Sequence, residues 1–262
     1  MRRLLLALYL LSATPALAQE PEERDLCADR PGIASTTCTV DRGRIQVELA
    51  IDWSFQDDGE ERTDALLAGD TLVRVGIDQQ TELQLRWTAF GAVRTRDAAG
   101  ISHDRGVGDV SVGIRRNLRN PDGSGTSAAI QAAVTLPVGG SALGAGNWGA
   151  SLLLPLGFEV GNVQLLVAPG IEAAVDQDRH GRHFAYGLAV GGSFNLSERL
   201  SAVLDLSLQR DLDPLGHTTE ALAGLALSYQ PSPNFEVDLG AILGLNADSP
   251  DFELYLGAAR RF

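Results

Sequence analysis

Residues 45–55, which read IQVELAIDWSF, decide the fold of this chain. Large apolar side chains occupy every second position from Ile45 to Phe55, and small or polar side chains occupy the positions between them. Alternation with a period of two predicts a β-strand with one apolar face and one polar face. The stretch is longer than the 5–6 residues usual in soluble sheets and reaches the roughly 9–11 residues that a tilted strand needs to cross a bilayer. It therefore predicts a membrane-crossing strand.

The same alternation returns along the chain to its end, and no linker divides it. We expect one all-β domain over residues 44–262, a transmembrane antiparallel up-and-down β-barrel of about 12 strands. Pro155 and Pro169 predict bulges, because proline lacks the N–H that a strand ladder needs. The predicted strands cover residues 44–56, 65–77, 81–93, 107–118, 127–138, 147–160, 163–175, 183–196, 200–210, 218–230, 234–246 and 251–262.

The connections between these strands alternate in length. Short turns, such as residues 78–80 and 161–162, alternate with longer charged or glycine-rich connections, such as residues 91–106 and 138–147. Short turns at one end and long loops at the other are typical of outer-membrane barrels.

Aromatic residues on the apolar parity fall near the ends of the predicted strands, as in the two girdles of a membrane barrel. A soluble β-sandwich is the structural alternative, but its aromatic side chains gather in the core at mid-strand. Here mainly Trp87 has such a position. The loop-end set is Trp53, Phe55, Trp148, Phe184, Tyr186 and Phe252, and the turn-end set is Phe158, Phe194, Tyr229, Phe235 and Phe262.

The N-terminus has the features of a cleaved signal peptide. Arg2 and Arg3 precede a compact apolar stretch at residues 4–11, and Ala16-Leu17-Ala18 fits the small-x-small rule for cleavage before Gln19. A transmembrane anchor needs about 20 apolar residues, far more than this stretch offers. We therefore predict a signal peptide at residues 1–18 and a location in the outer membrane of a Gram-negative bacterium.

Residues 19–43 form a polar opening segment that we expect to lie in the periplasm. It contains the two cysteines of the chain, Cys27 and Cys38. Export provides an oxidising environment, so a disulfide between them is expected. The segment is too short for a plug domain, yet it has the alternative of folding into the lumen as a small stopper.

The chain is acidic, with 34 Asp and Glu against 21 basic residues and a formal net charge of −13. All the basic residues are arginine. Such a composition is a poor match for nucleic-acid phosphates, so we expect no nucleic-acid partner.

The polar parity of the strands predicts an acidic lumen. Two interpretations stay open: a narrow pathway that prefers cations or polar solutes, or a barrel filled by paired charges. Abundant glycine and alanine on the same parity favour the pathway. The predicted lumen-lining residues are Glu48, Asp52, Arg74, Arg86, Asp109, Arg115, Glu159, Glu172, Asp205, Glu236, Asp238, Glu253 and Tyr255.

All four histidines lie in or beside predicted long loops, near aspartates. Histidine and carboxylate together suit Zn²⁺ or Cu²⁺, but no fixed ligand spacing is present, so we assign no metal ligand and no cofactor. An enzyme is the less favoured alternative, because the sequence has no Gly-x-Ser-x-Gly and no His-x-Ser-Asn cluster, and we assign no catalytic residue. The histidines are His103, His180, His183 and His217.

The chain ends on a predicted strand that closes at Phe262. An aromatic terminus with Gly257 five residues earlier resembles the signal by which outer-membrane barrels are recognised for assembly, although Arg260 occupies a position that is usually hydrophobic. An even strand number places both ends of the barrel in the periplasm.

The chain resembles the outer-membrane family named putative MetA-pathway of phenol degradation. The resemblance covers nearly the whole mature chain. It implies a small barrel that passes small solutes, aromatic compounds among them, although Tyr255 and Phe90 are the main inward aromatic residues. The expected partners are outer-membrane lipids, the barrel assembly machinery and the solute, and the expected state is a monomer. A structural or binding barrel without transport, or a lipid hydrolase, is the alternative. The motifs are Asp29-Arg30-Pro31-Gly32, Gly43-Arg44-Ile45-Gln46-Val47-Glu48, Gly106-Val107-Gly108-Asp109-Val110-Ser111-Val112-Gly113-Ile114 and Thr135-Leu136-Pro137-Val138-Gly139.

Overall fold

The computed structural model describes residues 23–262, so the expected signal peptide and the mature start at Gln19 lie outside the described residues. The described chain is all-β, and no helix in it is long and apolar enough to cross a membrane. The strands are β1 (Ile45–Asp57), β2 (Arg62–Gly76), β3 (Thr81–Asp97), β4 (Gly100–Gly106), β5 (Val110–Arg119), β6 (Ser127–Leu136), β7 (Gly149–Leu153), β8 (Leu156–Val160), β9 (Val163–Val175), β10 (Arg182–Asn195), β11 (Leu200–Asp211), β12 (Thr218–Ser232), β13 (Phe235–Gly244) and β14 (Phe252–Arg261).

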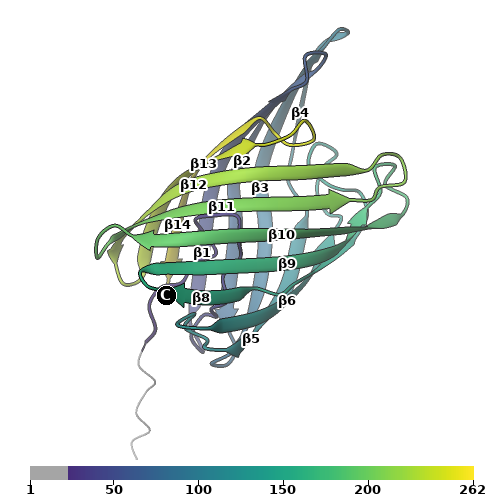
Figure 1. The fold of residues 1–262 in the computed structure, drawn as a ribbon. Coiled ribbons are helices and arrows are strands. Elements are labelled where there is room, and N and C mark those ends of the chain that lie inside the picture. The colour runs from purple at the N-terminus through teal and green to yellow at the C-terminus, as the bar shows by residue number, and fades with distance from the viewer. Residues whose placement is uncertain (1–22) are drawn as a thin grey trace, which may run out of the picture.

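These segments form one closed barrel (Figure 1). β4 and β5 pair with successive parts of β3 and together form one strand of the wall. In the same way β7 and β8 together form one strand between β6 and β9. The 14 segments therefore make 12 barrel strands. Each strand pairs antiparallel with its chain neighbours, the last strand β14 pairs with β1, and the pairing of β9 with β10 completes the circle. The predicted antiparallel up-and-down barrel of about 12 strands is confirmed.

The two prolines behave differently. The strand is interrupted at Leu154 and Pro155, between β7 and β8, as the missing donor predicts. The bulge expected at Pro169 was wrong: Pro169 pairs with Leu188 in β10 without a register shift. Its carbonyl accepts a hydrogen bond from the Leu154 N–H (3.0 Å), so its missing N–H faces the interrupted strand. One irregularity therefore accommodates both prolines.

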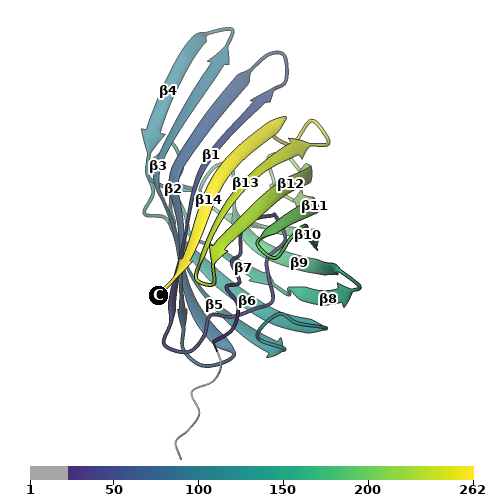
Figure 2. The same ribbon diagram turned by 90° about the vertical axis from the view of Figure 1, so that its left-hand side faces the viewer.

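Two hairpins, β1–β2 and β3–β4, extend beyond the rest of the barrel (Figure 2). The expectation of a long loop at residues 91–106 was wrong. β3 continues to Asp97, and its residues 91–97 pair with residues 100–106 of β4. Polar residues occur on both faces there, which removed the alternation from the sequence, but backbone pairing does not require an apolar face. We call this side the loop end and the opposite side, with the short turns and the C-terminus, the turn end.

The barrel is apolar outside and polar inside. Leu49, Ile51 and Trp53 of β1 are exposed on the outer surface, whereas Gln46 and Glu48 of the same strand are buried. A soluble protein has the opposite distribution, so the soluble sandwich does not apply. An apolar outer belt on a closed barrel suits a lipid environment.

Candidate functional site

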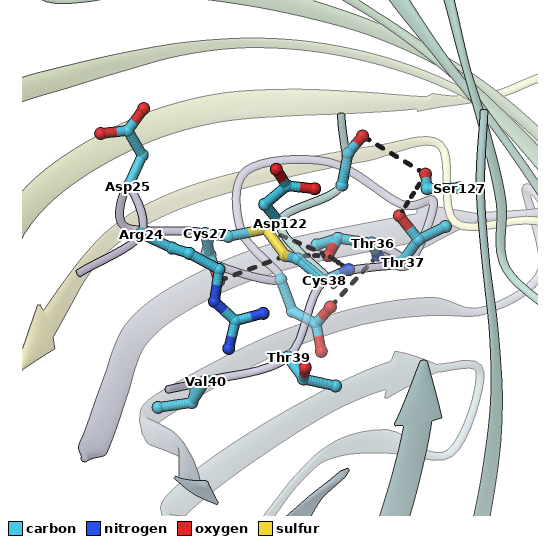
Figure 3. Close-up of a disulfide and its surroundings, with 12 residues drawn as sticks. Arg24, Asp25, Cys27, Thr36, Thr37, Cys38, Thr39, Val40, Asp122 and Ser127 are labelled. Atoms are coloured by element: carbon cyan, nitrogen blue, oxygen red, sulfur yellow. Dashed lines mark hydrogen bonds between the residues drawn. A yellow bond between two sulfur atoms is a disulfide. The ribbon is translucent and has the colours of Figure 1, made fainter. Parts of the chain in front are cut away.

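The described part of the opening segment lies inside the barrel (Figure 2). Residues 24–41, which we call the plug segment, enter at the turn end and contact the inner faces of strands on several sides of the wall (Figure 2). The disulfide between Cys27 and Cys38, drawn in Figure 3, is confirmed, and it joins Cα atoms that are 6.4 Å apart. It closes a loop of the segment inside the lumen.

Arg74 of β2 binds both ends of this closed loop. Its guanidinium donates to the carbonyl of Cys27 (2.6 Å) and to that of Cys38 (3.0 Å). It also donates to Glu82 (2.8 and 3.0 Å) and to Glu48 (3.2 Å). Because Arg74 has no solvent exposure, these acceptors satisfy a charge that is otherwise costly to bury.

Arg115 of β5 holds the middle of the segment. Its guanidinium donates to both carboxylate oxygens of Asp29 (2.8 and 2.7 Å) and to the amide oxygen of Gln131. Burial alone raises the pKa of Asp29, but the positive charges of Arg115 and Arg74 outweigh burial and hold that pKa well below its ordinary value. Asp29 is therefore a carboxylate throughout the physiological pH range. Its own N–H donates to Glu48, which ties the segment to β1 as well.

Arg30 points to the other side of the wall. Its Nε lies 3.4 Å from Asp238 of β13, and its guanidinium lies over the ring of Tyr255 at 4.7 Å. The Tyr255 hydroxyl accepts a hydrogen bond from the Gly32 N–H (3.2 Å). Gly257 leaves room beside them, because a Cβ at that position would push against the side chains of Arg30 and Asp238. Gly257, which resembles part of an assembly signal, thus has a second, local reason to be glycine.

Neutral hydrogen bonds complete the attachment near the turn end. Thr37 contacts the Ser127 hydroxyl (2.7 Å; Figure 3). The Thr37 carbonyl accepts a hydrogen bond from the Asn117 side chain (2.7 Å). Beside these neutral bonds, the Val40 N–H donates to the carboxylate of Glu82 in β3 (2.7 Å). The segment is therefore fixed by charge pairs, by this bond to a carboxylate and by uncharged contacts to β5 and β6.

Two cavities border the plug segment on the side of β9–β12. One, of about 190 Å³, separates the plug segment from the wall near Gly191, Ser201 and Glu236. The other, of about 320 Å³, includes Ile33 of the plug segment and wall residues such as Ala168, Ala185 and Gly187, and its charged lining residues are Glu172 and Glu220. Small side chains on this wall leave the space that the large polar side chains fill on the opposite side.

The predicted lumen residues are found in three settings. Most are buried around the plug segment: Glu48, Arg74, Arg115, Asp205, Glu236, Asp238 and Tyr255. Asp52, Asp109, Glu172 and Glu253 are half-buried. Arg86 and Glu159 are exposed, Arg86 beside Asp70 (3.1 Å) and Glu159 at the turn end.

Asp109 organises a loop. Its carboxylate accepts hydrogen bonds from the N–H groups of Gly139 (2.7 Å) and Ala145 (2.8 Å). In the same loop Leu143 packs against Gly91 on the inner face of β3. The connection between β6 and β7 therefore folds inward at the loop end.

Several residues of this network are absent from the predicted set. Glu82 follows directly after a short turn, where a polar residue is expected in any case, yet it is buried and accepts from Arg74. Gln46, Gln84 and Asn117 are neutral and buried. All four lie on the polar parity of their strands, and that was the signal available to find them.

Comparisons with known proteins agree with this fold. The sequence model of a family described as "Putative MetA-pathway of phenol degradation" matches residues 28–262. No curated protein matches the sequence.

Solved structures that resemble the chain include two porins. The NanC porin has a TM-score of 0.52 and 7% identity, over 81% of this chain and 98% of that chain. The KdgM porin has a TM-score of 0.52 and 10% identity, over 82% of this chain and 99% of that chain. The CymD monoaromatic hydrocarbon channel has a TM-score of 0.46 and 9% identity, over 85% and 89%. At such identities the two porins support the fold alone.

Proposed function

The chain belongs to the family described as "Putative MetA-pathway of phenol degradation", and from this premise we propose that it is an outer-membrane channel for small solutes, restricted at the turn end by its own plug segment. The observation that carries the proposal is the pair of cavities, both between the plug segment and the β9–β12 wall. A channel requires unfilled space beside the plug segment, and these cavities supply part of it.

The proposed route enters at the loop end and follows the β9–β12 wall. The larger cavity has only carboxylates, Glu172 and Glu220, among its charged lining residues. Charged side chains that line a narrow pore select against like charge. We therefore propose a preference for cations and small polar solutes. Aromatic solutes remain a proposal from the family's description, since the one aromatic residue beside this cavity, Tyr186, stacks on Phe184 and is exposed on the outer face.

The proposed partners are outer-membrane lipids at the apolar belt and the barrel assembly machinery, with the chain as a monomer after removal of residues 1–18. The proposal includes no catalytic residue. Folded protein that hydrolyses a phospholipid or lipid A ester contradicts this part.

Single-channel conductance in planar bilayers tests the proposal. We compare the intact mature chain with a variant that lacks residues 19–40 and expect the deletion to raise the conductance severalfold, with a reversal potential in a salt gradient that indicates cation preference. Heat-modifiable migration on a gel confirms that both proteins are folded barrels. A folded deletion variant that stays silent refutes the channel and assigns a structural or binding role, the alternative favoured by the many bonds to the plug segment.

A further inference from the structure

A second cluster of polar side chains lies at the loop end of the same wall. Asp176 follows β9, His183 lies at the start of β10, and Asp211 and Asp213 lie at the end of β11 and just beyond it. The His183 side chain is 5% exposed, although it is polar and lies near the barrel mouth. The cluster therefore has three carboxylates and one imidazole, so its net charge is negative even when the imidazole is protonated.

Both ring nitrogens of His183 face carboxylates. Nδ1 lies 2.9 Å from Oδ1 of Asp176 and 3.4 Å from Oδ2 of Asp213. Nε2 lies 2.7 Å from Oδ1 of Asp211 but forms no aligned hydrogen bond. A neutral imidazole has one N–H and one lone pair. Hence both nitrogens are satisfied only if the ring carries a second proton or if a cation lies between one nitrogen and its carboxylates.

The spacing on the Nδ1 side fits a metal ion. Zn²⁺ binds imidazole nitrogen and carboxylate oxygen at about 2.1 Å. Two ligands at that distance are about 3.0 Å apart when they subtend 90° and about 3.4 Å apart when they subtend a tetrahedral angle. The observed separations from Nδ1 to Asp176 and to Asp213 are 2.9 and 3.4 Å. Ligand atoms of all three residues lie within 4.8 Å of one another.

The surroundings hold these groups in place. Asp213 accepts hydrogen bonds from the N–H groups of Gln177 (2.6 Å) and Leu215 (2.7 Å), so its carboxylate connects the loop after β9 to the loop after β11. Asp211 lies at the far nitrogen of His183, where a carboxylate commonly orients a metal-bound imidazole. The arrangement therefore has both a ligand set and an orienting group.

We propose that Asp176, His183 and Asp213 bind a divalent first-row transition-metal ion, represented by Zn²⁺, at the loop end of the barrel. One imidazole with two carboxylates suits such ions, and water completes the coordination. Asp211 is a positioning residue. The site joins two loops beside the larger cavity and goes beyond the proposed channel function, which does not require it.

Equilibrium dialysis of the folded, detergent-solubilised barrel against Zn²⁺ tests the proposal, with Co²⁺ absorption as a second readout of nitrogen and oxygen ligation. We expect one ion per chain. His183→Gln should remove this binding, and Asp211→Asn should weaken it by about 10- to 100-fold. His180→Gln is the matched control, since His180 lies in the same loop region and its side chain is 89% exposed; it should leave binding unchanged.

The outcomes are distinct. Absence of stoichiometric binding, or equal binding by wild type and His183→Gln, overturns the site and leaves a protonated imidazole as the partner of the carboxylates. If His183→Gln does not fold, Asp176→Asn gives the same test without changing the buried ring. Neither readout involves conductance, so a failed metal site leaves the channel proposal unaffected, and a silent channel leaves the metal site unaffected.

Discussion

Replacement of Arg74 by methionine should release the plug segment. Methionine fills most of the space of the arginine stem but has no donor, so the carbonyls of Cys27 and Cys38 and the carboxylates of Glu48 and Glu82 each lose a partner. Breaking a buried ion pair on one side commonly costs about 3–5 kcal/mol.

The lower end of that range applies here, because both carboxylates keep other donors. Glu82 still accepts from Gln84 (2.7 Å), and Glu48 still accepts from Gln46 (2.9 Å). A loss of about 3 kcal/mol in the docking free energy lowers the ratio of docked to released segment by roughly 150-fold, at about 1.4 kcal/mol per factor of ten.

The assay is the open fraction of single channels, with cleavage of the plug segment by protease as a second readout. Arg86→Met is the matched control: Arg86 is also an arginine of a neighbouring strand, but it is 52% exposed, pairs with Asp70 and does not contact the segment. Exposed pairs contribute about 0–1 kcal/mol, so the control should change the open fraction less than about fivefold. If folded Arg74→Met and Arg86→Met behave alike in both readouts, the buried network does not hold the segment, and the reasoning is refuted.

Three further outcomes are expected from the same contacts. Reduction of the disulfide between Cys27 and Cys38 removes a constraint worth on the order of 3 kcal/mol and should raise the open fraction, whereas reductant should have no effect on a Cys27→Ser/Cys38→Ser variant. The lowered pKa of Asp29 means that its contribution is complete above its ordinary value of 3.8 and is lost only as the pH falls through the lower folded value. The difference in protease protection between the intact chain and an Asp29→Asn variant should therefore be constant from pH 7 to pH 5, and a difference that disappears by pH 5 contradicts this assignment. Gly76→Val places a side chain against the carbonyl oxygens of Val40 and Asp41 and should loosen the end of the segment, visible as faster protease cleavage there; unchanged cleavage contradicts the close approach.

The alternation of apolar and polar residues was sufficient to predict the barrel, but it was insufficient to predict which contacts fill the interior of the barrel. The period of two in residues 45–55 predicts which side chains of β1 point inward, because that property depends on the strand alone. What those side chains meet depends on segments far away in the chain. Arg74 contacts Cys27, Cys38, Glu48 and Glu82, and no spacing in the sequence relates these positions.

Two sequence predictions, a long loop at residues 91–106 and a bulge at Pro169, failed for the same physical reason. Residues 91–106 have no apolar face and yet form strand, because the hairpin of β3 and β4 lies beyond the apolar belt and is held by backbone pairing. Pro169 has no bulge, because its neighbour across the ladder is already interrupted at Pro155. In both cases the neighbouring strand determines the local structure, and the sequence of one strand does not show which strand pairs with it.

The wall of the barrel is chemically divided, and this division connects the site with the proposed route. β2 and β5 provide Arg74 and Arg115, which are fully buried and hold one side of the plug segment. The facing strands β9–β12 provide two cavities and one buried carboxylate, Asp205, which accepts hydrogen bonds from the backbone of Ile33 and Ala34. Within the described part of the chain, no arginine of these strands binds the segment, so this side holds it with fewer charged contacts. A plug held equally on all sides has to leave the barrel to admit a solute. A plug held more firmly by β2 and β5 than by the facing wall can admit a solute along that wall while it stays in place, and this asymmetry is the reason to place the route beside β9–β12.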